Sequence, residues 1–123
     1  MNLYASREDY LEAILVLYKK FGSVRSVDIA RHMGVSKPSV CHAVNVLCDG
    51  GFLTKDDKHF ISLTEEGRKV AEKIYERHKF FKEQLISAGV RPNIAETEAC
   101  RIEHCISDES FLKLKEYREK DKG

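Results

Sequence analysis

The sequence has 123 residues, of which 42% are hydrophobic and 33% charged, and its net charge at pH 7 is +1. These values fit a small globular protein of one or two compact units, and the near-neutral charge alone indicates neither a nucleic-acid nor a membrane partner. No apolar run approaches the roughly 20 residues that span a bilayer, and residues 1–10 are too polar for a secretory leader. We therefore expect a cytoplasmic protein without a membrane partner, whose four cysteines are reduced thiols.

The first predicted helix begins at Ser6, a residue type that caps helix N-termini, and ends at Gly22. Apolar residues recur between them at helical spacing. Asp9 and Glu12 are three residues apart, so they share one face of this helix. From the residues alone, the simplest interpretation is that these carboxylates complement the helix dipole.

Two short helices are predicted next, over residues 27–33 after Ser26 as cap and over residues 37–48 with Pro38 in the first turn. Gly34 lies in the turn between them, and the pair forms a helix-turn-helix. Its outer face carries polar side chains that reach phosphates and base edges, namely Ser36, Lys37, Ser39, His42 and Asn45. We predict that this face binds DNA, with Pro38 shaping the start of the recognition helix. An ordinary three-helix fragment with a polar outer face is the alternative.

A β-hairpin is predicted after the second of these helices, because β-favouring runs at residues 52–54 and 60–63 flank a polar segment. A hairpin in this position is the wing of a winged helix-turn-helix. Lys55 and Lys58 near its tip are candidates for phosphate contacts, although Asp56 and Asp57 partly cancel their charge.

The rest of the chain predicts helices only, over residues 64–87, 94–104 and 108–118. The expected class is therefore mainly α with a small β-hairpin wing. We assign residues 1–72 to a winged helix-turn-helix DNA-binding domain and residues 73–123 to a helical domain. Three helices of this size bury little surface alone, which predicts a homodimer whose core comprises Phe80, Phe81, Leu85, Ile86 and Ile102.

The segment from Cys100 to His104 brings together three kinds of metal-ligating side chain. On a helix, Cys100, Glu103 and His104 stand at positions i, i+3 and i+4 and share one face. A thiol, a carboxylate and an imidazole that point in one direction are suited to a transition metal. A small buried cysteine beside an ordinary surface Glu–His pair is the alternative, and the residues alone leave both open.

Several motifs, in their order and spacing, together resemble the DtxR/MntR family of metal-dependent transcriptional repressors. The motifs are Glu8–Ile14, Asp28–Ala30, Gly34–Val40, Leu63–Arg68, Arg77-His78, Glu98–His104 and Ser107–Glu109. The resemblance implies a winged-helix DNA-binding domain, a helical dimerisation domain, double-stranded operator DNA as partner, and Mn²⁺ or Fe²⁺ as corepressor. In length the chain looks more like the short manganese-sensor branch than like members with a third, SH3-like domain.

The resemblance also implies a set of metal ligands. The matching positions are Asp9 and Glu12 in the first helix, His78 in the long helix, and Cys100, Glu103 and His104 near the third. The set is a hybrid, since manganese-type members usually have a carboxylate at the position of Cys100 and iron-type members a methionine at that of Asp9. A thiolate favours thiophilic ions, so we expect Zn²⁺ or Co²⁺ to bind in vitro as well. Glu96 is a further candidate ligand, and Lys82 replaces the glutamate of an iron-type ancillary site.

Three other functions fit parts of the pattern. One is a metal-independent winged-helix regulator that responds to a ligand or to oxidation of Cys41/Cys48 or Cys100/Cys105, although the first pair is expected in the core. A small metallohydrolase needs an open metal position and a nearby general base, and nothing in the sequence indicates a substrate pocket. A dimeric module whose wing binds protein is the third. We predict a DNA-binding regulator and not an enzyme.

Overall fold

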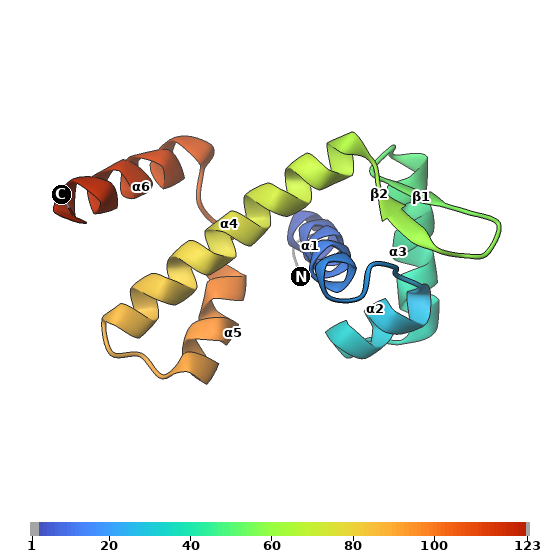
Figure 1. Ribbon diagram of the computed structural model, residues 1–123, viewed down its shortest axis with the longest axis horizontal. Coiled ribbons are helices and arrows are strands. Elements are labelled where there is room, and N and C mark those ends of the chain that lie inside the picture. Colours follow the sequence, from blue (N-terminus) through green and yellow to red (C-terminus); the bar gives the residue numbers. More distant parts are fainter. Residues whose placement is uncertain (1–2, 123) are drawn as a thin grey trace. The chain divides into compact units, whose positions relative to one another are not determined.

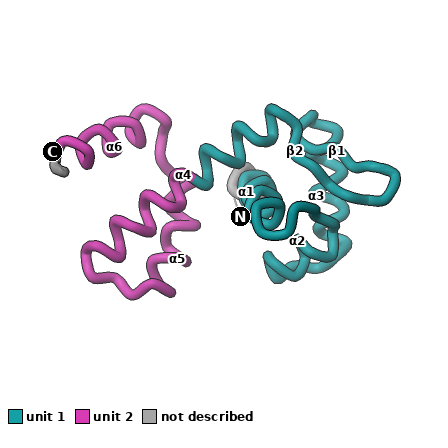
Figure 2. Tube along the Cα trace, viewed as in Figure 1, with its two compact units in different colours: residues 1–75 teal, residues 76–123 magenta. Residues whose placement is uncertain are grey.

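The computed structural model describes residues 3–122, and the side chains of residues 7–120. In chain order its elements are α1 (Leu3–Phe21), α2 (Ser26–Met33), α3 (Lys37–Asp49), β1 (Leu53–Lys55), β2 (Ile61–Leu63), α4 (Glu65–Ser87), α5 (Pro92–Ile102) and α6 (Asp108–Lys122) (Figure 1). The predicted mainly helical class with one hairpin is confirmed. The chain divides into two compact units, residues 1–75 and 76–123, with the boundary inside α4 (Figure 2).

The core of the first unit forms on the buried face of α1, where Leu11, Ile14 and Leu17 are at most 4% exposed. Full burial of one such side chain stabilises the fold by about 1.5–3 kcal/mol. The other helices and the hairpin complete this core with Ile29, Val40, Val44, Leu47, Leu53, Ile61 and Ala71. The apolar spacing read from the sequence therefore selects the face of each helix that packs inward.

The helix-turn-helix forms as predicted, apart from its first cap. Gly34 ends α2 in the left-handed conformation, at a φ of 69°, which glycine adopts without strain. The Ser36 hydroxyl accepts the Ser39 backbone N–H at 3.3 Å and so caps α3. The prediction of Ser26 as cap is wrong: Asp28 accepts the backbone N–H of Arg25 at 2.9 Å, which moves the cap one residue earlier.

Two further expectations in this unit are corrected. The first helix begins at Leu3, so Ser6 lies inside it and does not precede it. Cys41 is exposed and Cys48 is half-buried, whereas both were expected in the core. The inward face of α3 is defined by Val40, and Cys41 is rotated away from it by one residue.

The hairpin is a two-stranded antiparallel sheet in which Leu53 lies opposite Leu63. Its turn is closed by the carboxylate of Asp56, which accepts the backbone N–H groups of Lys58 and Phe60, each at 2.9 Å. Leu53 and Ile61 are each 2% exposed and attach the hairpin to the core.

The first turn of α4 passes very close to the backbone of Phe52, the residue just before β1. The Thr64 hydroxyl accepts the Gly67 backbone N–H at 3.1 Å, so Thr64 caps the helix as predicted. A Cβ atom on Gly67 would lie 2.0 Å from the Phe52 carbonyl oxygen, well inside contact distance. Only glycine allows α4 to leave the hairpin at this point.

The second unit contains the C-terminal part of α4 together with α5 and α6. Phe80 packs edge-on against Phe81 and Phe111, with ring centroids 5.2 and 5.3 Å apart, and these rings join α4 to α6. Two of the residues expected in a dimer core are thus packed within the chain. The large apolar side chains that this unit exposes, among those described, are Ile86, Leu112, Leu114 and Tyr117.

The connection between α4 and α5 differs from the prediction in one respect. Gly89 follows the end of α4, as predicted, and adopts a φ of 102°, which glycine reaches without strain. Pro92 opens α5 instead of terminating the segment before it, because its missing N–H is not needed in a first turn. Nowhere between residues 3 and 122 does a helix combine the length and the apolar character needed to cross a membrane.

Candidate metal centre

The second unit brings His78, Cys100 and Glu103 together, with their ligand atoms all within 4.8 Å of one another. The His78 Nδ1 atom lies 2.9 Å from the Glu103 Oε2 atom and 3.6 Å from the Cys100 Sγ atom. The histidine comes from α4, the cysteine from α5 and the glutamate from the residue that follows α5. Buried Ala95 and Ala99 have small side chains that permit a close approach of α5.

The prediction that Cys100, Glu103 and His104 share one helix face is wrong in its last member. The helix ends at Ile102, and Glu103 keeps helical backbone angles as the C-terminal cap residue. His104 follows in a turn. Its Nε2 atom still lies 3.3 Å from the Glu103 Oε1 atom, so the two oxygens of Glu103 face one histidine each.

The Glu103 side chain is fully buried, at 0% exposure. An isolated carboxylate there would cost several kcal/mol of desolvation energy, so its charge requires a cation nearby. Hydrogen bonds from His78 to Cys100 and to Glu103 raise the pKa of His78 to about 11, although its burial opposes this shift. A protonated His78 ring is thus one cation that can balance the charge of Glu103.

A divalent ion fits the same surroundings. Cysteine sulfur, carboxylate and imidazole are all transition-metal ligands; His78, Cys100 and Glu103 already converge, and His104 lies beside Glu103. Binding through the Nδ1 atom of His78 requires this atom to release its proton, which exchanges one cation for another next to Glu103. The chemistry of this unit is therefore that of a cation site.

Glu96, the further candidate ligand, lies on the other side of the His78 ring. Its Oε1 atom is 2.9 Å from the Nε2 atom of His78, and its Oε2 atom is 2.8 Å from the Nζ atom of Lys82. The Glu96 carboxylate is therefore directed at the ring nitrogen that does not face Cys100 and Glu103.

Asp9 and Glu12 belong to α1, in the first unit, and both are half-buried. They are one helical turn apart, as the sequence indicated. Their role as metal ligands stays a prediction that rests on the family pattern.

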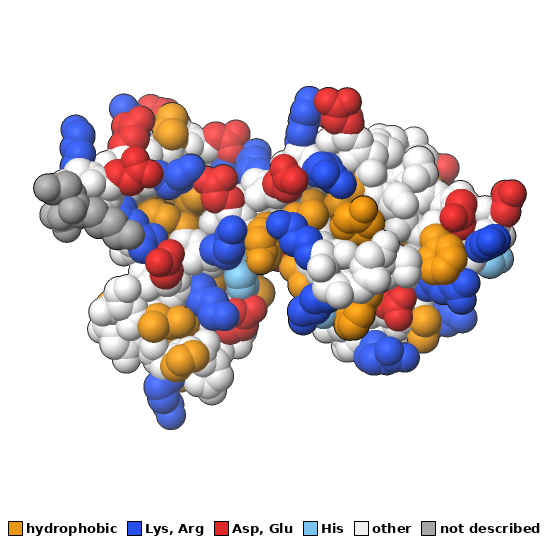
Figure 3. Space-filling view, viewed as in Figure 1, with side chains coloured by type: hydrophobic (Ala, Val, Ile, Leu, Met, Phe, Trp, Pro, Cys, Tyr) orange, Lys and Arg blue, Asp and Glu red, His pale blue; other side chains and the backbone are white. Residues whose placement is uncertain are grey.

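The predicted DNA-binding residues of the helix-turn-helix lie at the N-terminal end of α3, and Ser36, Lys37, Pro38, Ser39 and His42 are all exposed. The Ser36 hydroxyl donates to the Ser39 hydroxyl at 2.8 Å. Lys55 and Lys58 are exposed on the hairpin. Acidic and basic side chains and a histidine gather at the end of this hairpin (Figure 3).

Sequence reasoning assigned no role to Arg77, which the structure places next to the segment that carries two of the candidate metal ligands. Its side chain is 5% exposed, and its guanidinium donates to the carbonyl oxygens of Glu103 at 3.3 Å and Ile106 at 2.7 Å. It also forms an ion pair with Asp108 and packs over the ring of Phe111. Arg77 thus fixes the segment that carries Glu103 and His104. The sequence does contain a signal for a buried role of Arg77: this arginine stands three residues after Ile74, which is buried, and so lies on the apolar side of a long helix.

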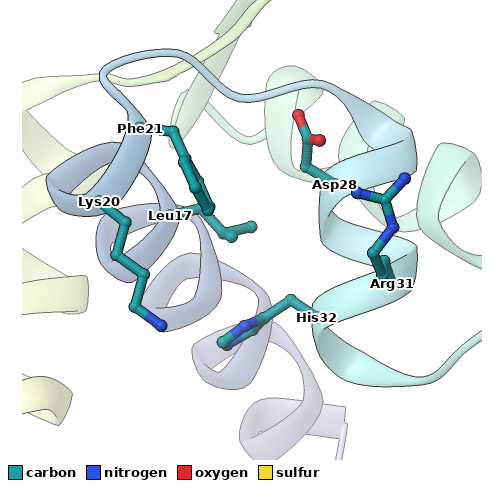
Figure 4. Close-up of a pocket in the computed structure, with 6 residues that line it drawn as sticks. All are labelled: Leu17, Lys20, Phe21, Asp28, Arg31 and His32. Atoms are coloured by element: carbon teal, nitrogen blue, oxygen red, sulfur yellow. The ribbon is translucent and has the colours of Figure 1, made fainter.

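A pocket in the first unit lies between α1 and α2 (Figure 4). It is lined by Leu17, Lys20 and Phe21 from α1 and by Asp28, Arg31 and His32 from α2. None of the predicted site residues lines it.

Two family models match this chain. Residues 2–59 match the N-terminal DNA binding domain of the iron dependent repressor, and residues 64–121 match its metal binding and dimerisation domain. The chain belongs to the iron-dependent repressor family. The resemblance to DtxR/MntR repressors is thereby confirmed, and the three residues that converge in the second unit fall within the metal-binding match.

Comparison with individual relatives supports the same family assignment. The chain is 36% identical over 104 residues to the transcriptional regulator MntR of Escherichia coli O157:H7. The matched segment covers 85% of this chain and 67% of that protein. It is 33% identical over 119 residues to an uncharacterised HTH-type transcriptional regulator of Methanocaldococcus jannaschii, covering 95% of each. These relatives are described as regulators, and neither description names an enzyme.

Solved structures show the same fold. The manganese regulator SloR matches with a TM-score of 0.82 and 27% identity, over 92% of this chain and 53% of that one. The IdeR protein of T. acidophilum matches with a TM-score of 0.71 and 31% identity, over 86% of this chain and 50% of that one. The iron-dependent repressor chain described here therefore spans about half the length of these two structures.

Proposed function

We propose that this chain is a metal-dependent transcriptional repressor that binds double-stranded operator DNA as a homodimer and controls metal homeostasis in the cytoplasm. The observation that carries the proposal is the buried Glu103 carboxylate, which has one oxygen toward His78 and the other toward His104. It lies in the part of the chain that matches the metal-binding domain of a repressor family. A buried charge that needs a cation gives the protein a physical means of responding to metal.

In this proposal, His78, Cys100, Glu103 and His104 bind the ion from the second unit, and Asp9 and Glu12 contribute carboxylates from the first, following the family's ligand pattern. Ligands from both units then couple the orientation of the recognition helix to metal binding. Two such helices in a dimer read half-sites about 34 Å apart. A coupling free energy of about 1–3 kcal/mol changes DNA affinity by about 5–150-fold.

We propose Mn²⁺ or Fe²⁺ as the metal sensed. Carboxylate oxygens favour Mn²⁺, whereas the Cys100 thiolate favours more thiophilic ions. Zn²⁺ and Co²⁺ are expected to bind in vitro because they stand higher in the affinity order of divalent ions.

The first test requires only the wild-type protein. A duplex is selected from random-sequence DNA by rounds of binding in the presence of Mn²⁺, and its affinity is then measured by fluorescence anisotropy with Mn²⁺, with Fe²⁺ and with a chelator. We expect a palindromic sequence with half-sites about one helical turn apart, and binding about 5–150-fold tighter with metal than with chelator. Equal affinity under all three conditions would establish a metal-independent regulator, and repeating the measurement with an added oxidant would then show whether that regulator is a redox switch.

A second prediction concerns the recognition helix. Lys37 is exposed in the first turn of α3, where it is placed to neutralise a phosphate. Lys37→Ala is expected to weaken binding to all sequences alike and to lower the slope of log affinity against log salt by about 0.9. Lys69→Ala, which removes an exposed lysine of α4, is the control. An unchanged salt slope in Lys37→Ala would exclude a phosphate contact.

A further inference from the structure

The His78 ring lies between two carboxylates, one at each nitrogen. Nδ1 faces Glu103 at 2.9 Å, with the Cys100 sulfur at 3.6 Å, and Nε2 faces Glu96 at 2.9 Å. The side chain of His78 is only 11% exposed and that of Glu103 is fully buried, whereas the Glu96 side chain is 49% exposed, so the ring separates a buried carboxylate from one at the surface. The two nitrogens of an imidazole are chemically distinct, and the hydrogen bond at one decides what the other can bind.

Glu96 is itself held in place by a second contact. Its Oε2 atom lies 2.8 Å from the Nζ atom of Lys82, four residues after His78 on the same face of α4. Glu96 thus bridges two neighbouring side chains of α4 from its place on α5. Each oxygen of the Glu96 carboxylate thus already has a nitrogen partner, and the ammonium group of Lys82 balances its charge locally.

We propose that Glu96, held by Lys82, is a positioning residue for His78, which keeps a proton on Nε2 and leaves Nδ1 as the nitrogen that binds metal. Metal-ligating histidines commonly donate their second N–H to a carboxylate, which fixes the ring and its tautomer. Because Lys82 supplies positive charge on this side, Glu96 is not a metal ligand and the Nε2 side of His78 takes no second ion. This inference rests on the proposed function, since it specifies how one ligand of that metal is held.

The test compares three variants of the full chain. Glu96→Ala removes the acceptor, Glu96→Gln keeps an acceptor oxygen but not the charge, and Glu98→Ala is a control at an exposed position two residues further along α5. Two quantities are measured. One is the ¹⁵N–¹H correlation spectrum of the histidine rings in metal-free and Zn²⁺-loaded protein, with His78 assigned through His78→Asn. The other is Zn²⁺ binding in competition with a chelator, which gives the dissociation constant and the number of ions bound per protomer.

The wild type should show a protected Nε2–H signal for His78 with and without Zn²⁺, and a metal-shifted Nδ1 resonance when Zn²⁺ is bound. Glu96→Ala should lose that protected signal and bind Zn²⁺ about 10–100-fold more weakly, as outer-shell partners of metal ligands do. Glu96→Gln should keep the signal and most of the affinity, and Glu98→Ala should match the wild type. Glu96→Ala is expected to bind as many ions per protomer as the wild type, only more weakly. A variant that had lost its fold would bind fewer ions, so the two effects can be told apart.

Three results would overturn the inference. The first is that Glu96→Ala equals Glu98→Ala in both measurements. The second is that Zn²⁺ shifts the Nε2 resonance in the wild type. The third is that Glu96→Ala lowers the number of ions bound, which would make Glu96 a ligand. Failure of the proposed function is separate. A wild-type protein that binds none of the metals disproves the metal-dependent regulator, while the Nε2–H signal of the metal-free variants still reports on Glu96.

Discussion

Glu103→Gln is expected to abolish the metal-dependent gain in operator affinity, removing the whole of the roughly 5–150-fold coupling. The variant keeps the shape of the side chain but removes the only fully buried carboxylate among the described residues of the second unit. An uncharged amide presents one oxygen instead of two and no longer requires a cation beside His78 and His104. Metal affinity should fall by more than the 10–100-fold typical of outer-shell partners, because a direct ligand is lost.

The measurement is the Zn²⁺ and Mn²⁺ dissociation constant together with operator binding with metal and with chelator. Glu98→Gln is the matched control, since Glu98 is exposed on α5, the helix that ends just before Glu103. DNA binding in the presence of chelator should be the same for both variants. If Glu103→Gln retains the wild-type response to metal, the buried carboxylate is structural and the proposed centre is wrong.

The first unit could be predicted well from the sequence because its signals are local. Gly34 ends α2, Ser36 caps α3 and Thr64 caps α4, and each of these helix ends is marked by a residue type that favours it and by a contact within a few positions. The apolar spacing then selects the buried face of each helix. The error at Ser6 concerns where α1 begins, since the helix already includes Leu3. The error at Ser26 arises because Asp28 accepts the backbone N–H of Arg25, which makes Arg25 the cap although its side chain is not of a capping type.

The candidate metal centre was less accessible to sequence reasoning. From the residues alone, the triplet ending at His104 had an ordinary explanation, and only the family resemblance added His78. The end of α5 depends on a contact across the fold, where Arg77 donates to the carbonyl oxygens of Glu103 and Ile106. Because Arg77 supplies hydrogen-bond donors to these two carbonyl oxygens, they do not need partners within a helix. The helix therefore ends before His104, although no glycine or proline in the sequence marks its end.

The pairing of Glu96 with Lys82 is a further feature that no local pattern reveals. The two residues are far apart in the sequence, and each alone is typical of an exposed helix face. Their meeting at His78 follows from the packing of α5 on α4, which buries Ala95 and Ala99 between larger neighbours. Sequence spacing identifies which residues share a helix, but packing decides which nitrogen of a histidine a carboxylate reaches.

Arg77→Met should destabilise the second unit and weaken its metal binding together. Methionine retains an apolar stem next to Phe111 but leaves the carbonyl oxygens of Glu103 and Ile106 without the guanidinium. A buried acceptor that loses its donor costs about 1–3 kcal/mol. The Glu103 carbonyl contact is buried and the Ile106 contact only partly so, and we therefore expect the free energy of unfolding to fall by about 2–3 kcal/mol. The ion pair with Asp108 adds little to this sum, because the Asp108 side chain is 74% exposed.

Urea denaturation of the metal-free protein measures this loss, with Arg68→Met at an exposed position of α4 as the control. Arg77→Lys gives the more demanding comparison, since a lysine keeps the charge but lacks the planar fork that reaches several acceptors at once. If fixing the segment from Glu103 to Ile106 depends on that fork, Arg77→Lys should resemble Arg77→Met in stability and in Zn²⁺ affinity. A lysine variant with wild-type stability and affinity would show that charge alone holds the segment, and that the two carbonyl contacts are dispensable.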